Sequence, residues 1–158
     1  MATLEPRRAL PSDASMLARL CLELGYDCTE FLMRQRLVRL RDDPEHAVFV
    51  VAAESGEIIG WLHAEVRKTL WGDPFVQIMG MVVRTLTRRR GVGRALIRHA
   101  EAWADSRGLE QVQASPQEHR EDAHAFFEAM GYAPTEELQV WSRTVEDVDP
   151  GGTPTLVD

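Results

Sequence analysis

The sequence predicts an α/β (α+β) fold in which one mixed β-sheet is flanked by about four helices. A continuous apolar run at 46–53 and an alternating run at 58–67 are separated by a turn that contains glycine, which is typical of an antiparallel hairpin. A long amphipathic segment at 91–107 follows, and strand-like and helical patterns alternate after it. Because hairpins join antiparallel strands whereas helical crossovers join parallel ones, the sheet is expected to be mixed.

The N-terminal third is expected to supply one short strand and two helices. A polar strand at 4–8 precedes Asp13, a residue type that favours helix starts, and apolar residues then recur at helical spacing until Gly25. Thr29 is the expected cap of a second helix, which ends before Pro44 because the residue ahead of a proline disfavours helical backbone. These two helices would flank the sheet.

The middle of the chain is expected to hold a third strand followed by the longest helix. The third strand is predicted at 75–83, where Gly80 indicates a bulge or a close approach by another backbone. The helix at 91–107 carries one apolar stripe and is expected to stop at Gly108.

The last third is expected to complete the domain and leave a short tail. Its patterns predict a strand at 111–115, a helix at 121–130 and a strand at 138–145. We therefore expect one domain over residues 1–146, a common size for a single hydrophobic core. Residues 147–158 combine proline, glycine and acids, which predicts a disordered acidic tail.

Composition limits the classes of partner. The chain has a formal net charge of −7, which argues against general nucleic-acid binding and favours the approach of a cationic small molecule. No run approaches the roughly 18 apolar residues that a membrane span needs, so no membrane partner is expected. The two cysteines, Cys21 and Cys28, are too few for a disulfide scaffold, and a reducing cytoplasm is the expected location. A homodimer is the assembly that we expect.

One short segment of this acidic chain is strongly basic. A predicted strand ends near Val83, and a loop of arginines and glycines then leads into the long helix. Helix N-termini present unpaired N–H groups and a partial positive charge, glycine permits close approach, and arginine donates charge-assisted hydrogen bonds to phosphate. The segment therefore predicts a pyrophosphate site. Its candidate residues are Arg88, Arg89, Arg90, Gly91, Val92, Gly93 and Arg94.

Spacing excludes a P-loop and argues against a dinucleotide-binding loop. A P-loop needs Lys and then Ser or Thr after its last glycine, whereas Gly93 is followed by Arg94. A dinucleotide-binding loop needs a third small residue where this chain has Leu96, and no repeated strand-helix-strand pattern surrounds it.

The pattern of Val83, four residues, and then Arg88-x-x-Gly91-x-Gly93 resembles the acyl-CoA motif of the GNAT superfamily of N-acetyltransferases. The segment 123–132 is similar to the last helix of that superfamily, and the other predicted elements follow the same order. The two segments together make this resemblance more specific than the glycine motif alone.

The resemblance covers roughly residues 4–145 and implies a GNAT-like, V-splayed sheet. It implies that acetyl-CoA is the co-substrate, with its pantetheine arm between the strands that end at Val83 and Ser115. In this arrangement the arm pairs with strand backbone, as an added strand does. The residues that it implies for coenzyme binding, besides the basic loop, are Met81, Val82, Val83 and Phe127.

The sequence departs from the family pattern at two positions that matter for proton transfer. Phe127 stands where many relatives have a tyrosine that protonates the leaving thiolate, and Gln77 stands where many have a glutamate base. If a protein group assists, the candidates are His119 and Glu65, which have titratable side chains of a suitable type. The pair of His63 and Glu65 on one strand face is more typical of a surface pair.

No metal site is expected, because His119, Asp122 and His124 do not have the spacing of a zinc-binding helix and no cysteine lies near them. Three tryptophans are candidates for an acceptor pocket, although core packing is the expected role of two of them. They are Trp61, Trp71 and Trp141.

The function predicted from the sequence is acetyl transfer from acetyl-CoA to a primary amine of a small cationic molecule, by direct attack in a ternary complex. The alternative is a GNAT-like module that binds acyl-CoA as a sensor or interaction domain without turnover, and the absence of the usual tyrosine and glutamate favours that alternative. Nucleic-acid binding through the arginines is a third and more remote reading.

Overall fold

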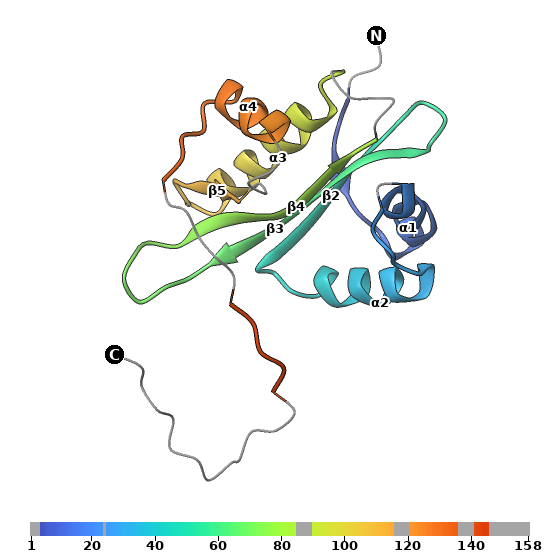
Figure 1. Ribbon diagram of the computed structural model, residues 1–158, viewed down its shortest axis with the longest axis horizontal. Helices are drawn as coiled ribbons and strands as arrows, with labels where there is room; N and C mark the ends of the chain where they lie inside the picture. The colour runs from blue at the N-terminus through green and yellow to red at the C-terminus, as the bar shows by residue number, and fades with distance from the viewer. Residues whose placement is uncertain (1–3, 24, 85–89, 116–120, 136–140, 146–158) are drawn as a thin grey trace.

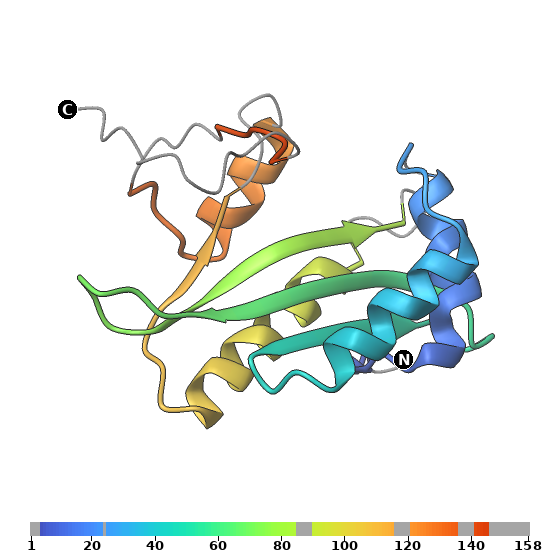
Figure 2. The same cartoon turned by 90° about the horizontal axis from the view of Figure 1, so that it is seen from below.

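The protein folds as three layers, with helices on both faces of one five-stranded sheet (Figures 1 and 2). The structure is a computed structural model. It describes residues 4–23, 25–84, 90–115, 121–135 and 141–145.

The elements follow the predicted order. They are β1 (Arg7–Arg8), the 3-10 turn η1 (Pro11–Asp13), α1 (Ala14–Glu23), α2 (Glu30–Arg41), β2 (His46–Ala52), β3 (Ile58–Arg67), β4 (Phe75–Val83), α3 (Val92–Ser106), β5 (Val112–Ala114) and α4 (Glu121–Ala129). Among the residues described, no helix is both long and apolar enough to cross a bilayer.

The sheet is mixed, as predicted, and its strands lie in the order β1-β2-β3-β4-β5. The first three junctions are antiparallel, and only β4 and β5 run parallel. In β4 the register slips by one residue, because His63 pairs with Gly80 whereas Ala64 pairs with Ile78. Met79 is therefore the extra residue of a β-bulge, which confirms the irregularity predicted at Gly80.

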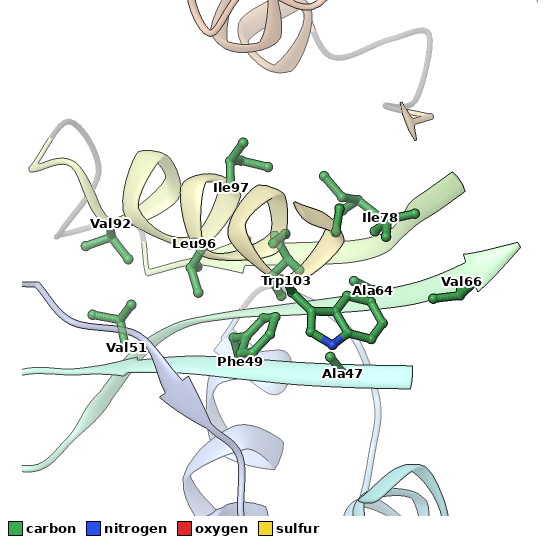
Figure 3. Packing of buried hydrophobic residues seen from close by; sticks show 14 of the residues in the cluster. Ala47, Phe49, Val51, Ala64, Val66, Ile78, Val92, Leu96, Ile97 and Trp103 are labelled. Carbon is green, nitrogen blue, oxygen red and sulfur yellow. The ribbon is translucent and has the colours of Figure 1, made fainter. Parts of the chain in front are cut away.

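The strand β2 is covered on both faces, as its continuous apolar run predicts. Val50 packs in a cluster with residues of α1 and α2, whereas Phe49 and Val51 pack in the cluster that α3 covers. Figure 3 shows the second cluster, in which Leu96 and Trp103 of α3 face the strands. This packing fixes α3 against the sheet, and with it the turn at which α3 begins.

The prediction of a last strand at 138–145 is wrong over the residues that are described. Residues 141–145 have no regular structure, and the side chains of Trp141 and Val145 are 87% and 75% exposed. A strand needs a neighbour that takes its backbone hydrogen bonds, and none of the described pairings involves this segment. Residues 136–140 and the predicted tail at 147–158 lie outside the described residues.

A part-buried ion pair closes the N-terminus of α1 against β1. Arg7 donates to both carboxylate oxygens of Asp13, at 2.8 and 2.9 Å, and the amide of Leu10 donates to the same carboxylate at 2.7 Å. The hydrogen bonds from Arg7 lower the pKa of Asp13, even though its burial acts in the opposite direction. Asp13 therefore stabilises the fold in its charged form.

We expect Asp13→Asn to lower the free energy of unfolding at neutral pH by about 2 kcal/mol, since it removes a charged acceptor from three donors. Because the pKa of Asp13 is lower in the folded chain, its contribution is complete above the usual carboxylate range and is lost as the pH falls through the folded value. Urea unfolding at neutral and at acidic pH measures this, with the exposed Asp105→Asn as control. An equal loss for the two variants would contradict the prediction.

Candidate active site

A continuous cleft of about 1450 Å³ runs through the part of the molecule that the structure describes. It opens where β4 and β5 separate, because their ladder has only three residue pairs and ends at Ile78 and Ala114. Beyond that point Met79–Val83 of β4 and Ser115 after β5 line the cleft. The sheet is therefore splayed here, which agrees with the predicted shape.

The cleft reaches both faces of the sheet. One part, here called the α3 side, is lined by the first turn of α3, the end of β4 and α4. The other part, here called the α2 side, is lined by α2, the loop before it and the outward face of β3. The lining of the α2 side includes Tyr26, Asp27, Cys28, Arg36, Trp61 and His63.

The first turn of α3 presents backbone donors to the α3 side. Gly91 is the N-cap, with a left-handed φ of 83°. The first helical bond that follows it runs from the amide of Ala95 to the carbonyl of Gly91, at 2.9 Å. The amides of Val92, Gly93 and Arg94 precede that bond, so they have no acceptor within the helix. All three residues line the cleft, which therefore receives the positive end of the helix dipole.

Gly93 is glycine because α4 packs against it. An added Cβ would lie 3.3 Å from Cζ of Phe126 and 3.7 Å from Cγ2 of Val83. A larger side chain at this position would push α4 away from the end of β4. Glycine is thus favoured at position 91 by the left-handed backbone conformation and at position 93 by the close packing of α4.

Among the described residues, the end of β4 has no strand paired to the edge that faces the cleft. The amide of Arg84 donates to the carbonyl of Ile59 on β3, at 2.8 Å. Backbone groups alternate in direction along a strand, so those of Met81 and Val83 point away from β3. Both residues line the cleft. An extended ligand there can pair with the strand edge.

Aromatic residues of α4 and of the segment after it close the α3 side without offering an acidic proton. Phe127 lines the cleft and packs edge-to-face against Phe126 and Tyr132, at centroid distances of 5.3 Å in both cases. The hydroxyl of Tyr132 donates to Glu101 of α3, at 3.2 Å. Burial, followed by the effect of Glu101, raises the pKa of Tyr132 well above its ordinary value. Tyr132 is therefore a packing and anchoring residue.

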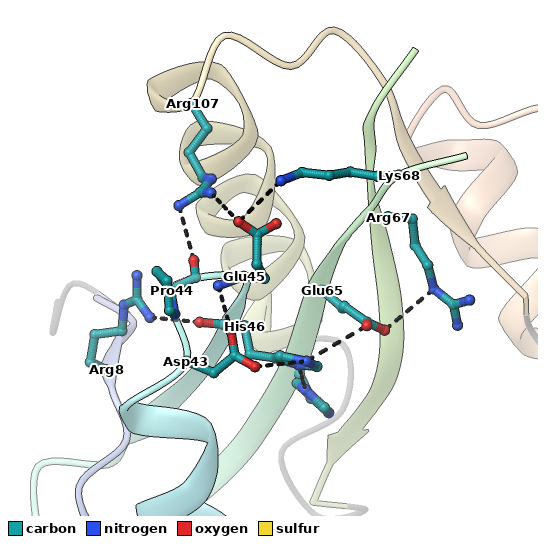
Figure 4. A network of polar contacts seen from close by, with 10 residues as sticks. Arg8, Asp43, Pro44, Glu45, His46, Glu65, Arg67, Lys68 and Arg107 are labelled. Carbon is teal, nitrogen blue, oxygen red and sulfur yellow. Dashed lines mark hydrogen bonds and ion pairs between the residues drawn. The ribbon is translucent and has the colours of Figure 1, made fainter. Parts of the chain in front are cut away.

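A polar network lies behind the α2 side (Figure 4). Nδ1 of His46 is 2.9 Å from Nε2 of His63, and Nε2 of His46 is 3.6 Å from Glu65 and 3.8 Å from Asp43. Glu65 also pairs with Nε of Arg67, at 3.3 Å. Of these side chains, only that of His63 lines the cleft.

The structure brings together most of the predicted coenzyme-binding residues that it describes. Arg90 is described and exposed but does not line the cleft, whereas Arg88, Arg89 and His119 lie outside the described residues. Glu65 faces the network rather than the cleft. The predicted residues that line it are Met81, Val82, Val83, Gly91, Val92, Gly93, Arg94 and Phe127.

Sequence reasoning missed several residues of the α2 side and misjudged two tryptophans. Trp61 lines the cleft, whereas Trp71 and Trp141 are 88% and 87% exposed, so the expectation that two of the three pack in the core is wrong. Tyr26 and Asp27 lie in the loop between α1 and α2, where no periodicity marks them. The sequence signal that could have indicated them is an aromatic residue beside an acid in a short interhelical loop.

Comparisons with known proteins agree with this architecture. The model of the Acetyltransferase (GNAT) family matches residues 15–132. The aminoglycoside N(6')-acetyltransferase type 1 of Stenotrophomonas maltophilia is 29% identical over 144 residues, which cover 89% of this chain and 93% of that protein.

Two solved structures share the fold. The aminoglycoside antibiotic 6'-N-acetyltransferase AAC(6')-Ih of Acinetobacter baumannii has a TM-score of 0.77 at 19% identity, over 90% of this chain and 99% of its own. AAC(6')-Iy in complex with the bisubstrate analogue CoA-S-monomethyl-acetylneamine has a TM-score of 0.78 at 18% identity, over the same shares. The fold and the matched family define an acyltransferase. The chain belongs to the GNAT acetyltransferase family and is an N-acetyltransferase.

Proposed function

We propose that the protein transfers an acetyl group from acetyl-CoA directly to a primary amine of a small cationic molecule, with both substrates bound in one cleft. The observation that carries this proposal is the continuity of the cleft from the first turn of α3 to Trp61 and His63. Its volume of about 1450 Å³ exceeds the roughly 300–1,000 Å³ of a usual single-ligand pocket. The space therefore suits two ligands that meet inside the protein.

The α3 side is the proposed site of acetyl-CoA. The amides of Val92, Gly93 and Arg94 would bind the pyrophosphate, and Arg88, Arg89 and Arg90 would add charge from the loop before them. The pantetheine arm would pair with the backbone of Met81 and Val83 along the edge of β4. Phe127 would pack near the thiol end. Arg84 is held elsewhere, by Glu23 at 3.3 Å and Glu57 at 2.8 Å.

The α2 side is the proposed acceptor site. Trp61 and Tyr26 supply aromatic surface, and Asp27 supplies a carboxylate that attracts a cation. The net charge of −7 favours the same ligand charge at longer range. The relatives named above are aminoglycoside acetyltransferases, and aminoglycosides are polycationic amines, which supports this acceptor class.

Direct transfer is supported by the thiols of the cleft. Burial raises the pKa of Cys21, so its side chain is a neutral thiol and a poor nucleophile. Cys28 accepts a hydrogen bond from Arg36, at 3.4 Å, and is the remaining thiol on the lining. Full activity of Cys28→Ser, with initial-rate lines that intersect when both substrates are varied, would support attack without an acyl-enzyme.

We expect thiol release from acetyl-CoA with neamine as acceptor and much less with glutamate, an anionic amine. Asp27→Asn should raise the KM for neamine roughly 2- to 5-fold, the range for one exposed charge, and added salt should raise it further by screening. The exposed Asp73→Asn in the β3–β4 loop is the matched control. Turnover of glutamate alone would overturn the cationic acceptor, and coenzyme A binding without thiol release from any amine would overturn transfer.

A further inference from the structure

His63 is the titratable side chain of the α2 side that contacts further polar groups, which are partly buried. It lies on β3 opposite Gly80, where the bulge in β4 interrupts the register. Gly80 has no side chain, and a Cβ there would lie only 3.2 Å from the ring of Trp61. The glycine thus leaves room for the ring of Trp61. Trp61 and His63 line the cleft on alternate residues of β3.

Behind His63 the polar groups form a chain that leads out of the cleft. His63 contacts His46 through facing ring nitrogens 2.9 Å apart, and the far nitrogen of His46 faces Glu65 and Asp43 at 3.6 and 3.8 Å. Figure 4 shows His46 between these two carboxylates, with Arg67 beyond Glu65. The chain begins at the cleft on β3, passes through β2, and ends at half-exposed acids.

The neighbours of the two imidazole rings favour one arrangement of their protons. Two carboxylates lie 3.6 and 3.8 Å from Nε2 of His46, and their negative charge favours a hydrogen on that nitrogen, which leaves Nδ1 of His46 as the acceptor. In this arrangement Nε2 of His63 donates to Nδ1 of His46. This leaves Nδ1 of His63 with a free lone pair, the form of imidazole that accepts a proton.

The surroundings favour the neutral form of His63 over its charged form. Burial and then the neighbouring His46 lower the pKa of His63, while Glu65 acts in the opposite direction with a smaller effect. The other charged groups nearby are Asp43 in the turn before β2, Arg67 paired with Glu65, and Asp27 and Arg36 across the cleft.

The side chains of this network, which are those of His46, His63, Glu65 and Asp43, do not suit a shared metal ion. Two nitrogens bound to one tetrahedral zinc lie about 3.3 Å apart, given Zn–N bonds of about 2.0–2.1 Å. The 2.9 Å between His46 and His63 is a hydrogen-bond distance. No group of three or more ligands with metal-site geometry occurs among the residues described.

We propose that His63 is the general base that removes a proton from the acceptor's ammonium group, and that His46 and Glu65 carry that proton to solvent. This inference rests on the proposed cationic acceptor, because a neutral amine needs no such base. The sequence analysis named Glu65 as a candidate for direct removal of the amine proton. In this proposal Glu65 instead receives that proton from the two histidines.

The step balances as follows. Nδ1 of His63 takes one proton from R–NH₃⁺, Nε2–H of His63 passes to Nδ1 of His46, and Nε2–H of His46 passes to Glu65 and then to water. The freed lone pair forms the C–N bond at the thioester carbonyl and the C–S bond breaks. A second proton moves from the nitrogen to the departing sulfur. The products are the amide, coenzyme A as a thiol and one released proton.

The test compares His63→Gln with wild type on two acceptors over a pH series. Neamine presents ammonium groups at neutral pH, whereas the fluorines of 2,2,2-trifluoroethylamine leave its nitrogen mostly unprotonated. We expect kcat/KM for neamine at pH 7 to fall about 100-fold and then to rise with pH in the variant, whereas the wild type stays level. The rate with trifluoroethylamine should fall less than about threefold.

Controls separate base catalysis from structure. His63→Ala should regain activity with added imidazole, which a purely structural role would not allow. Glu65→Gln should shift the pH profile and leave coenzyme A affinity unchanged, and the exposed His124→Gln of α4 should match wild type. If wild type turns over neamine and His63→Gln keeps its rate and profile, this proposal is wrong and the proposed function stands. If wild type binds coenzyme A but releases no thiol with neamine or any other amine, the proposed function is wrong, and this inference, which rests on it, is wrong with it.

Discussion

Replacing Gly91 and Gly93 together by valine is expected to weaken coenzyme A binding by more than about 100-fold, close to 3 kcal/mol. At Gly91 the left-handed φ of 83° is strained for a β-branched residue, so the N-cap would shift. At Gly93 the new side chain would displace Phe126, which lies 3.3 Å from the Cβ position. Both changes remove the donors of the first turn from the cleft. Calorimetric titration with coenzyme A measures the loss.

The matched control lies at the other end of the same helix. Gly108 also has a left-handed φ, 71°, but nothing lies within 4 Å of its Cβ position. Gly108→Val should therefore cost stability without changing coenzyme A affinity. Unchanged affinity in a folded Gly91/Gly93 variant would remove the first turn of α3 from the binding site.

The second large effect is expected at Gly60, where α3 crosses β3. A Cβ there would lie 2.7 Å from Cγ1 of Val92, 3.2 Å from the carbonyl of Val82 and 3.3 Å from Cδ1 of Leu96. We expect Gly60→Ala to lower the free energy of unfolding by about 3 kcal/mol, the upper end for overpacking, because Val92 and Leu96 are fully buried and cannot yield. Urea unfolding measures the change.

A double variant tests the cause. Val92→Ala removes the nearest contact, so it should restore part of the stability that Gly60→Ala loses, a coupling that distant sites do not show. Gly72→Ala is the control, since the nearest atom to its Cβ position is at 3.6 Å, an ordinary contact. Strictly additive losses for the first pair would show that the destabilisation arises elsewhere.

The elements could be predicted from the sequence because their signals are local. The cap at Thr29, the alternation in β3 and the stripe of α3 depend on neighbours within a few residues, and all three are present in the structure. The first turn of α3 was predictable for the same reason, since Gly91 and Gly93 lie within one motif.

The residues of the α2 side could not be predicted in the same way, because their position depends on tertiary packing. Asp27 and His63 lie 36 positions apart and line one surface only because the interhelical loop comes to lie over β3. The pair of His46 and His63 follows from the register of β2 and β3, in which His63 lies opposite Val48. Trp141 shows the opposite kind of error, in which burial was predicted for a residue that is exposed. Apolar character predicts burial only where a partner surface exists.

The short ladder between β4 and β5 would give the proposed coenzyme a part in stabilising the fold. Among the described residues, three residue pairs join β5 to the sheet. Phe126 and Phe127 of α4, and Met130 after it, pack against the core cluster that α3 covers. A pantetheine arm laid along Met81 and Val83 would occupy the space where those strands diverge and would tie the two edges to each other. Any ligand that binds only the folded form raises its stability with the logarithm of ligand concentration. The heat resistance of this enzyme would then depend on the coenzyme supply around it as well as on its own sequence.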